Sequence, residues 1–153
     1  MQYAGVSTAS IFIDDKSAST ISDQLLRSPY VLVVDDDEAI VSVLLLLLEG
    51  EGLSGIGITD SRNVFPFLSQ LETDQFPSVI LLDLMMPVLS GYEIASKLSQ
   101  SERYRHLPII IMTADGRVRS ASSVQGAIDY VAKPFQIDAL MTKLKSHLDR
   151  STS

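Results

Sequence analysis

Residues 30–37 read YVLVVDDD, an apolar run of strand length that ends in three carboxylates. The run is apolar throughout rather than alternating, as is typical of a parallel strand buried on both faces. Similar runs occur at Val79–Leu82, Pro108–Met112 and Ala127–Val131, with a weaker one at Gly55–Thr59. These runs predict five strands of one buried parallel sheet.

Stretches of helix length separate the runs, and we expect helices at residues 38–49, 62–72, 92–100, about 117–125 and 137–149. Asp37 and Ser61 are expected to cap the first two, and Ser90 with Glu93 matches a capping box for the third. Pro66 predicts that the second helix is short or bent. The fourth contains several serines and should be the least stable. Regular alternation of strands and helices predicts an α/β fold with right-handed crossovers.

The composition limits the class of protein. The 153 residues suffice for one domain of ordinary size. The absence of cysteine excludes disulfides, thiolate metal sites and a cysteine nucleophile. A net charge of -7 gives the surface no general attraction for nucleic acid. The longest apolar stretch, residues 40–48, is far shorter than the roughly 20 residues that a bilayer requires. We therefore expect a cytoplasmic protein without direct contact with nucleic acid or membrane.

Residues 1–28 differ from the rest of the chain, because they are rich in serine and threonine and lack a sustained apolar period. We expect a poorly ordered N-terminal extension with one helical turn at residues 22–27, a folded domain at residues 29–150 and a tail at 151–153. Residues 11–15 read IFIDD and imitate the strand and acid pair at 31–36. The spacing from Asp35 to Asp83 fits one strand–helix–strand–helix–strand unit, whereas Asp14 lies too far upstream.

Polar residues follow the expected strands directly. In a parallel sheet the carboxyl ends of the strands share one rim, where function gathers. The residues expected there are Asp35, Asp36, Asp37, Asp83, Thr113, Ala114, Asp115, Lys133 and Pro134. Clustered carboxylates need a cation, and oxygen ligands without histidine or cysteine favour Mg²⁺. A lysine and a threonine hydroxyl are natural partners of a phosphate, so the pattern indicates a phosphoryl-transfer centre with a carboxylate nucleophile.

Four ordered segments resemble the signatures of response-regulator receiver domains of two-component signalling. They are VLVVDDDE at 31–38, LLDLMMP at 81–87 followed by Ser90-Gly91, IMTA at 111–114 and DYVAKPF at 129–135. The resemblance covers residues 30 to about 149. It implies a flavodoxin-like (βα)5 doubly wound parallel sheet with strand order 2-1-3-4-5, a fold for which a chemotaxis receiver is a known example.

The resemblance also implies roles at the rim. Asp83 would attack the phosphorus of a phosphohistidine and become an aspartyl phosphate. Mg²⁺ (or Mn²⁺) would be held by Asp36 directly, by Asp35 mainly through water, and by Asp83 and the backbone carbonyl of Met85. Thr113 and the amide of Ala114 would bind phosphoryl oxygens, and Lys133 would pair with the phosphate. Tyr130 would turn inward when Thr113 moves to the phosphate, and Pro134 would follow a cis bond.

The partners implied by the resemblance are a sensor histidine kinase or a histidine phosphotransfer protein, and a downstream protein that remains to be identified. We expect a monomer or a phosphorylation-linked dimer. The fourth helix, fifth strand and fifth helix would form the contact surface. No output domain is expected after the last helix, and the chain would catalyse only its own phosphorylation and dephosphorylation.

The run Leu44–Leu48 has two explanations. Five consecutive residues at about 100° each encircle a helix, so at least one leucine should face away from the sheet. The leucines either fill a core under neighbouring helices, which is the explanation we favour, or include a docking contact for the helical bundle of the phosphodonor. The second explanation rests on the resemblance alone.

Three other functions fit the sequence less well. A flavin electron carrier needs a phosphate-binding loop after the first strand, but this loop is acidic. A phosphatase of the haloacid-dehalogenase type wants threonine or valine where Ala39 stands. A degenerate receiver would lack some of the five expected site residues, and all are present. His106 and His147 have no paired ligands nearby in the sequence and are expected at the surface.

Overall fold

The structure is a computed structural model that describes residues 10–13, 29–118, 120 and 123–151. The chain divides after Pro77 into two compact units, residues 1–77 and 78–153. Most of the expected N-terminal extension, including its helical turn at 22–27, lies outside the described residues. None of the described helices is both long enough and apolar enough to cross a membrane.

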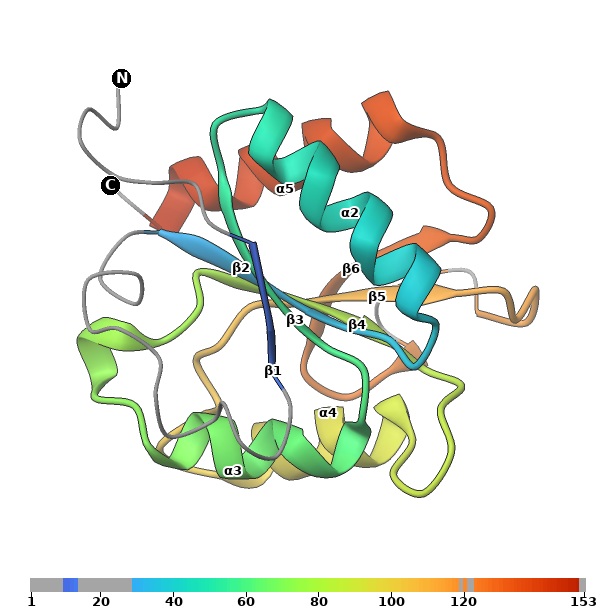
Figure 1. Cartoon of the computed structure of the whole chain (residues 1–153). Helices are drawn as coiled ribbons and strands as arrows, with labels where there is room; N and C mark the ends of the chain where they lie inside the picture. Colours follow the sequence, from blue (N-terminus) through green and yellow to red (C-terminus); the bar gives the residue numbers. More distant parts are fainter. Residues whose placement is uncertain (1–9, 14–28, 119, 121–122, 152–153) are drawn as a thin grey trace. The chain divides into compact units, whose positions relative to one another are not determined.

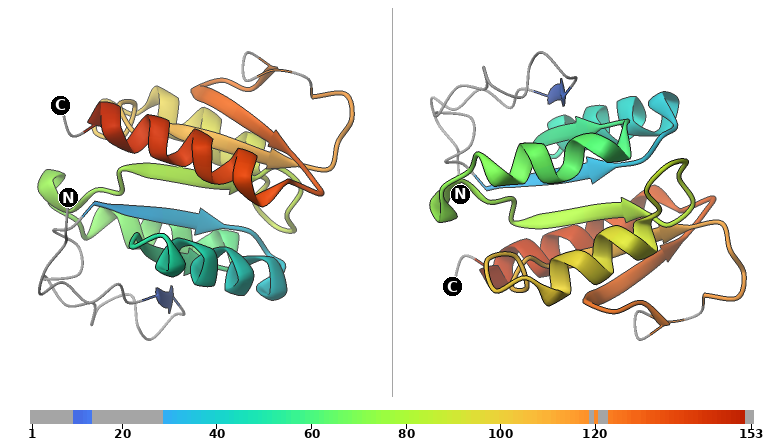
Figure 2. Two further views of the ribbon diagram at one scale, coloured as in Figure 1. Left: turned by 90° about the horizontal axis from the view of Figure 1, so that it is seen from above. Right: turned by 90° about the horizontal axis from the view of Figure 1, so that it is seen from below.

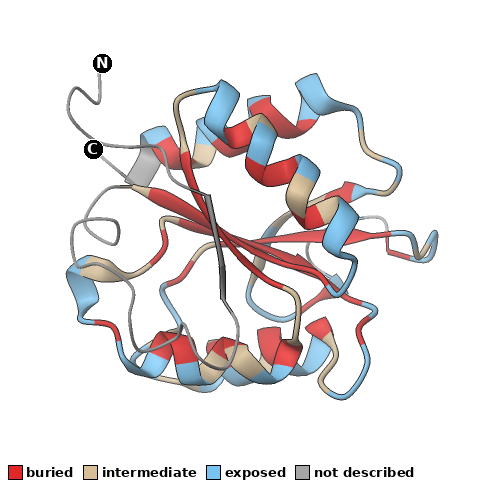
Figure 3. Cartoon of the chain, viewed as in Figure 1, coloured by how far each residue is buried: buried red, intermediate tan, exposed pale blue. Residues whose placement is uncertain are grey.

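The first unit is built on three parallel strands. β3 (Ser54–Ile58) lies in the middle, with β1 (Ser10–Ile13) on one side and β2 (Tyr30–Val34) on the other. Every residue of β2 and β3 is buried, as the uniformly apolar β2 segment predicts (Figure 3). α2 (Glu38–Gly50) and α3 (Val64–Ser69) cover opposite faces of these strands (Figures 1 and 2).

β1 is a strand that the sequence analysis did not predict. It belongs to the segment that imitates the first strand, and it pairs with β3 from Ser10 opposite Gly55 to Ile13 opposite Ile58. The isoleucines of this segment suit a strand. The segment thus resembles residues 31–36 in forming a strand as well as in sequence. The two acids that follow it, Asp14 and Asp15, lie outside the described part of the chain.

α2 begins as predicted. The side chain of Asp37 accepts hydrogen bonds from the amides of Ala39 (3.0 Å) and Ile40 (3.4 Å), which satisfies two donors of the first turn. The helix packs closely on β3 because Gly55 lacks a side chain. A Cβ at this position would come within 2.7 Å of Leu45 and 2.9 Å of Leu48.

The second predicted helix is short, as Pro66 indicated, and covers only part of the expected residues 62–72. A 3-10 turn, η1 (Ser61–Asn63), leads into the six residues of α3, with Pro66 in its first turn. The predicted cap, Ser61, is wrong, because Asp60 accepts from the amide of Arg62 at 3.0 Å and Ser61 is already in the turn. A second 3-10 turn, η2 (Thr73–Gln75), follows.

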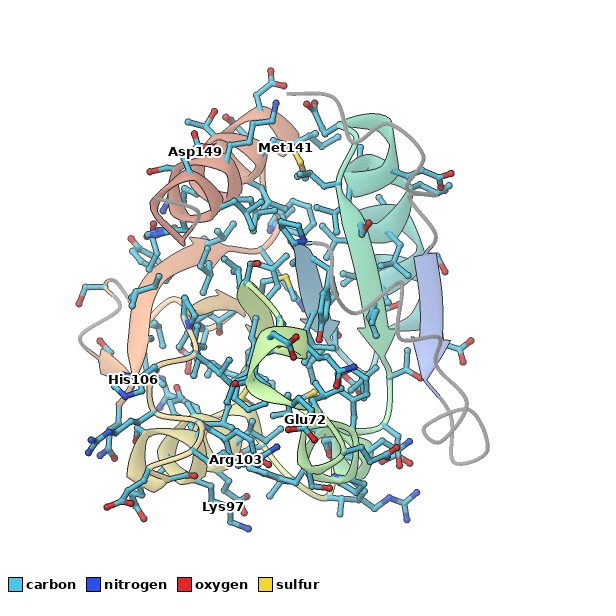
Figure 4. The ribbon with its side chains drawn as sticks, turned by 90° about the vertical axis from the view of Figure 1, so that its left-hand side faces the viewer. Glu72, Lys97, Arg103, His106, Met141 and Asp149 are labelled. Carbon is cyan, nitrogen blue, oxygen red and sulfur yellow. The ribbon has the colours of Figure 1, made fainter. Side chains whose placement is uncertain are left out.

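The second unit also contains three parallel strands, in the order β4 (Val79–Asp83), β5 (Ile109–Thr113) and β6 (Ala127–Ala132). α4 (Gly91–Gln100) and α5 (Ile137–Ser151) lie on opposite faces of them (Figure 1). The predicted capping box is present at α4, with Ser90 Oγ accepting from Glu93 at 3.2 Å and Glu93 Oε1 accepting from Ser90 at 3.4 Å. Met141 of α5 is buried (Figure 4).

The helix predicted near residues 117–125 is not found in the part of this segment that the structure describes. Residues 117, 118, 120 and 123–125 contain no α-helical residue, and residues 119, 121 and 122 lie outside the description. Gly116 and the serines of the segment have low helix propensity, which is the physical reason. Val118 and Val124 are nevertheless buried and fix the segment at two points.

Candidate functional site

The second unit places a buried acid and a lysine side by side. Asp83 is the last residue of β4, and Lys133 follows the last residue of β6. Lys133 Nζ lies 3.4 Å from Asp83 Oδ1, and the two side chains are only 15% and 6% exposed. Charges are seldom buried unless they are paired. Each charge of this buried pair is therefore balanced by the other. The sequence analysis expected both residues at the carboxyl ends of strands.

Thr113 lies at the end of the strand between them. It is 2% exposed, and its backbone oxygen accepts from the amide of Lys133 at 2.8 Å. Its hydroxyl oxygen accepts from the amide of Asp115 at 2.9 Å. The peptide bond between Lys133 and Pro134 is cis, as predicted. Backbone contacts thus fix the positions of Thr113 and Lys133 relative to each other.

Asp115 is engaged locally. Arg117 grips its carboxylate, with Nη2 2.8 Å from Oδ2, and the backbone amide of Arg117 also donates to Oδ1 at 2.9 Å. These hydrogen bonds from Arg117 lower the pKa of Asp115 to about 2. Asp115, one of the acids expected at the rim, therefore has its carboxylate bound by Arg117 within the turn after β5.

The loop after β4 closes on Asp83. The amide of Met85 donates to Asp83 Oδ1 at 3.4 Å, while the Met85 side chain is 61% exposed. Gly91, the first residue of α4, donates to the carbonyl of Leu84 at 3.0 Å. A Cβ on Gly91 would overlap the carbonyl oxygen of Asp83 and lie 2.7 Å from Leu84 Cα. The start of α4 therefore rests on the backbone of Asp83, a contact that the sequence analysis missed.

The first unit supplies the acids after β2. Asp35 is 1% exposed, its amide donates to the carbonyl of Ile58 at 3.2 Å, and its Oδ1 accepts from the amide of Asp37 at 3.0 Å. Asp36 is exposed. Since Asp37 caps α2, the three acids divide into one helix cap and two candidate metal ligands, Asp35 and Asp36.

Comparison with known families decides between the alternatives. The family model of the response regulator receiver domain matches residues 31–145. The chain belongs to this family. The types of residue expected of a receiver stand at each strand end described above. Membership of this family excludes the flavin electron carrier and the phosphatase as alternatives.

Curated relatives are regulators of transcription. The chain is 36% identical over 127 residues to the phosphate regulon transcriptional regulatory protein PhoB of Rhizobium meliloti, covering 80% of this chain and 53% of that protein. It is 39% identical over 120 residues to the DNA-binding transcriptional regulator NtrC of Klebsiella pneumoniae, covering 75% of this chain and 24% of that protein. The receiver thus spans about half or less of the length of these relatives.

A solved structure fixes the fold class. The receiver domain of the Francisella response regulator 1452 superimposes with a TM-score of 0.71 and 27% identity, over 81% of this chain and 99% of that one. The predicted flavodoxin-like sheet with strand order 2-1-3-4-5 is confirmed by this match. β1 precedes the residues that the family model matches.

A second charged cluster of the receiver lies between β6 and α5. Asp129 Oδ1 accepts from Lys143 Nζ at 3.0 Å, and its Oδ2 lies 3.2 Å from His147 Nε2. Lys143 also donates to the carbonyl of Tyr130 at 2.7 Å and lies 5.2 Å from the centre of its ring. Tyr130, the predicted switch residue, is therefore held beside α5 and is half-buried.

The histidines differ from each other. His106 is exposed in the segment between α4 and β5, as predicted (Figure 4). The prediction for His147 is wrong, since its side chain is only 12% exposed and contacts Asp129. Lys143 and His147 are four residues apart on one helix, so their shared face could have been read from the sequence. The acid opposite them could not, because it depends on how α5 packs on β6.

Asp129→Asn is expected to lower the melting temperature of the receiver at pH 7 by about 3 °C, roughly 1 kcal/mol, because it removes a partly screened ionic contact. Burial alone raises the pKa of Asp129, but hydrogen bonds from His147 and Lys143 outweigh it and hold this pKa below its ordinary value. Because folding lowers the pKa of Asp129, the stabilisation is present at pH values above the ordinary aspartate pKa of about 3.9. It is lost as the pH falls through the lower pKa of the folded state.

Thermal melts at pH 7 and at pH 3 check this prediction. The difference between the variant and the wild type should shrink at the lower pH. Glu102→Gln, which removes a charge from an exposed turn, is the matched control and should leave the melting temperature unchanged at pH 7. A loss for Asp129→Asn that is the same at both pH values would contradict the ionic origin of the effect.

Proposed function

We propose that the receiver is a phosphoacceptor switch in which Asp83 takes a phosphoryl group from a phosphohistidine. A carboxylate oxygen of Asp83 forms the new bond to phosphorus, the bond from phosphorus to the imidazole nitrogen breaks, and the imidazole leaves and takes up a proton. The single observation that carries the proposal is the buried pair of Asp83 and Lys133, at 3.4 Å. Lys133 offsets negative charge where the phosphoryl group would add more.

The acids of the first unit are part of the proposal through the fold. The five receiver strands of the order 2-1-3-4-5 are β2 to β6 of this chain, so its first and third strands are β2 and β4. These two are neighbours in that order, and the acids that follow β2 are therefore expected on the same rim as the end of β4. Receiver domains generally bind Mg²⁺ at an acidic pocket. The donor set fits a hard cation, because Asp36, Asp83 and the Met85 carbonyl offer only oxygen. Asp35, which is buried, would act mainly through water.

The bound cation (Mg²⁺ or Mn²⁺) would neutralise the carboxylates and the phosphoryl oxygens. Thr113 and the amide of Ala114 would hold phosphoryl oxygens. The Thr113 hydroxyl, which accepts from the Asp115 amide at 2.9 Å, would turn and donate to the phosphoryl group. Movement of Thr113 would make room for Tyr130, which is otherwise held at α5 by Lys143. Phosphorylation would in this way change the surface of β6 and α5.

Incubation with acetyl phosphate and Mg²⁺, followed by intact mass measurement, tests the proposal. We expect one phosphoryl group per chain, and none when the cation is removed by a chelator. Hydroxylamine should remove the group, because an acyl phosphate is cleaved by this nucleophile and a phosphoserine is not. A chain that stays unlabelled under all conditions would disprove the phosphoacceptor function.

The proposed phosphodonor is a histidine kinase or a histidine phosphotransfer protein, and α2 is the proposed docking helix. The structure separates the leucines of this helix. Leu44, Leu45 and Leu48 are buried, whereas Leu46 is 68% exposed and Val43 is 49% exposed. Core packing therefore accounts for three residues of the run, and Leu46 needs another explanation. An exposed leucine beside an exposed valine offers an apolar contact to a partner helix.

Leu46→Asp is expected to slow phosphotransfer about tenfold or more, as for the loss of an apolar anchor at an interface. Labelling by acetyl phosphate should be unchanged, because the substitution does not touch the acceptor. The measurement uses the kinase or phosphotransfer protein that labels the wild-type chain fastest. Glu49→Ala, exposed on the same helix, is the control. Equal rates for Leu46→Asp and the wild type would exclude docking at Leu46.

A cytoplasmic location and readout by a downstream protein complete the proposal. PhoB and NtrC are regulators of transcription by name. The receiver covers only part of these proteins, so the DNA binding named for NtrC is not assigned to this chain.

A further inference from the structure

β1 adds a strand where the rest of the sheet would have an edge. The family match begins at residue 31, so Ser10–Ile13 lies outside the part of the chain that the family accounts for. β3 pairs with β2 along one side and with β1 along the other (Figures 1 and 4). Each of the four residues of β1 has a partner in β3, without a register shift. Without β1, one side of β3 would present unpaired N–H and C=O groups.

β3 carries no protection of its own. Natural edge strands are blunted by charges, prolines or bulges, which prevent pairing with another chain. β3 reads SGIGI, with no charge and no proline, and all five residues are buried. β6, which pairs only with β5 among the described strands, differs. It carries Asp129, and its pairing has an irregularity at Ile109/Ile110. The unprotected strand is thus the one that β1 covers.

Helix α2 contributes to the place where β1 docks. It lies on β3, where Gly55 permits close approach by Leu45 and Leu48, and it also lies near β1. β1 therefore occupies a corner between the side of β3 and this helix. Because β3 is paired with β2 along its other side, its N–H and C=O groups would stay aligned and able to pair if β1 left.

We propose that residues 10–13 act as an edge guard, a strand of the same chain that closes β3 and keeps the receiver from pairing edge to edge with a second copy. When the guard leaves, β3 of one copy pairs with β3 of another. A two-fold axis makes such a pair antiparallel and self-complementary. The absence of charge on SGIGI means that nothing repels the second copy. The proposal does not depend on phosphorylation.

Two proline variants of the full chain, Ile11→Pro and Phe12→Pro, test the guard. Neighbouring residues of a strand direct their N–H groups to opposite sides, so only one of these positions should donate to β3. The variant that loses this donor should release β1 and form dimers as the concentration rises, measured by light scattering during gel filtration. The other variant should resemble the wild type, which is expected to be monomeric. Ile11→Ala, which retains the backbone donor, is the control.

Two further measurements keep the result interpretable. Circular dichroism will show whether the domain remains folded in each variant, and a synthetic peptide of residues 8–15 should return the dimer to monomer. Amide exchange of residues 54–58 should be slow in the wild type and faster on alternate residues when the guard is released and the chain is dilute. The proposal is overturned if both proline variants stay monomeric with the exchange pattern of the wild type, or if the wild type dimerises at the same concentration.

Discussion

Asp83→Asn should abolish labelling by acetyl phosphate altogether. The Asp83 side chain is only 6% exposed. The amide has nearly the shape of the carboxylate, so the asparagine side chain still fits this buried position. Its oxygen can still accept a hydrogen bond from Lys133. What it lacks is the negative oxygen that attacks phosphorus, and a neutral amide is a poor nucleophile. Intact mass after incubation with acetyl phosphate and Mg²⁺ measures the result directly.

Asp129→Asn provides a matched control for this experiment. Asp129 is also an acid paired with a lysine, with Lys143 Nζ at 3.0 Å, and it lies in the same unit. If any aspartate beside a lysine could accept a phosphoryl group, both variants would lose labelling in part. We expect Asp129→Asn to be labelled to the wild-type level at neutral pH. Full labelling of Asp83→Asn would show that another residue is the acceptor.

The sequence could place the candidate site residues at strand ends because strand ends can be located from apolar runs. Asp83 and Thr113 are the last residues of their strands, and Lys133 directly follows one. Once the runs were assigned to parallel strands, the identity of the next residue was enough to list the candidates. The acids after β2 were divided on other grounds, because Asp37 stands directly before a predicted helix and was expected to cap it. The hydrogen bond from the amide of Ala39 to Asp37 confirms this cap, whereas the hydrogen bond from the amide of Asp37 to Asp35 could not be predicted.

The features that were missed depend on tertiary contacts. β1 is four residues long, and its partner in β3 is distant in the sequence, so no local pattern marks the pairing. Asp60 and Ser61 are both good caps, and the choice follows from Arg62, which binds the Asp60 carboxylate with Nη2 at 2.6 Å. Gly91 looked like part of a helix start. Its closeness to Asp83 requires knowing how α4 lies against β4.

Gly91→Ala is expected to destabilise the receiver by about 3 kcal/mol, the upper end of the range for forcing an atom into a filled site. The added Cβ would overlap the carbonyl oxygen of Asp83, and backbone cannot move aside as a flexible side chain can. The melting temperature should fall by about 10 °C. Because the displaced backbone is that of the acceptor, the molecules that remain folded should also be labelled more slowly by acetyl phosphate.

Gly50→Ala separates this effect from the general cost of replacing glycine. Gly50 is the last residue of α2, and a Cβ there would have no neighbour within 4 Å. Alanine should leave the stability unchanged or raise it by up to about 1 kcal/mol, because it loses less backbone entropy on folding. Urea unfolding of both variants gives the comparison. If Gly91→Ala were as stable as Gly50→Ala, the start of α4 would not rest on the acceptor strand, and Asp83 would owe its position to Lys133 and the β5 ladder alone.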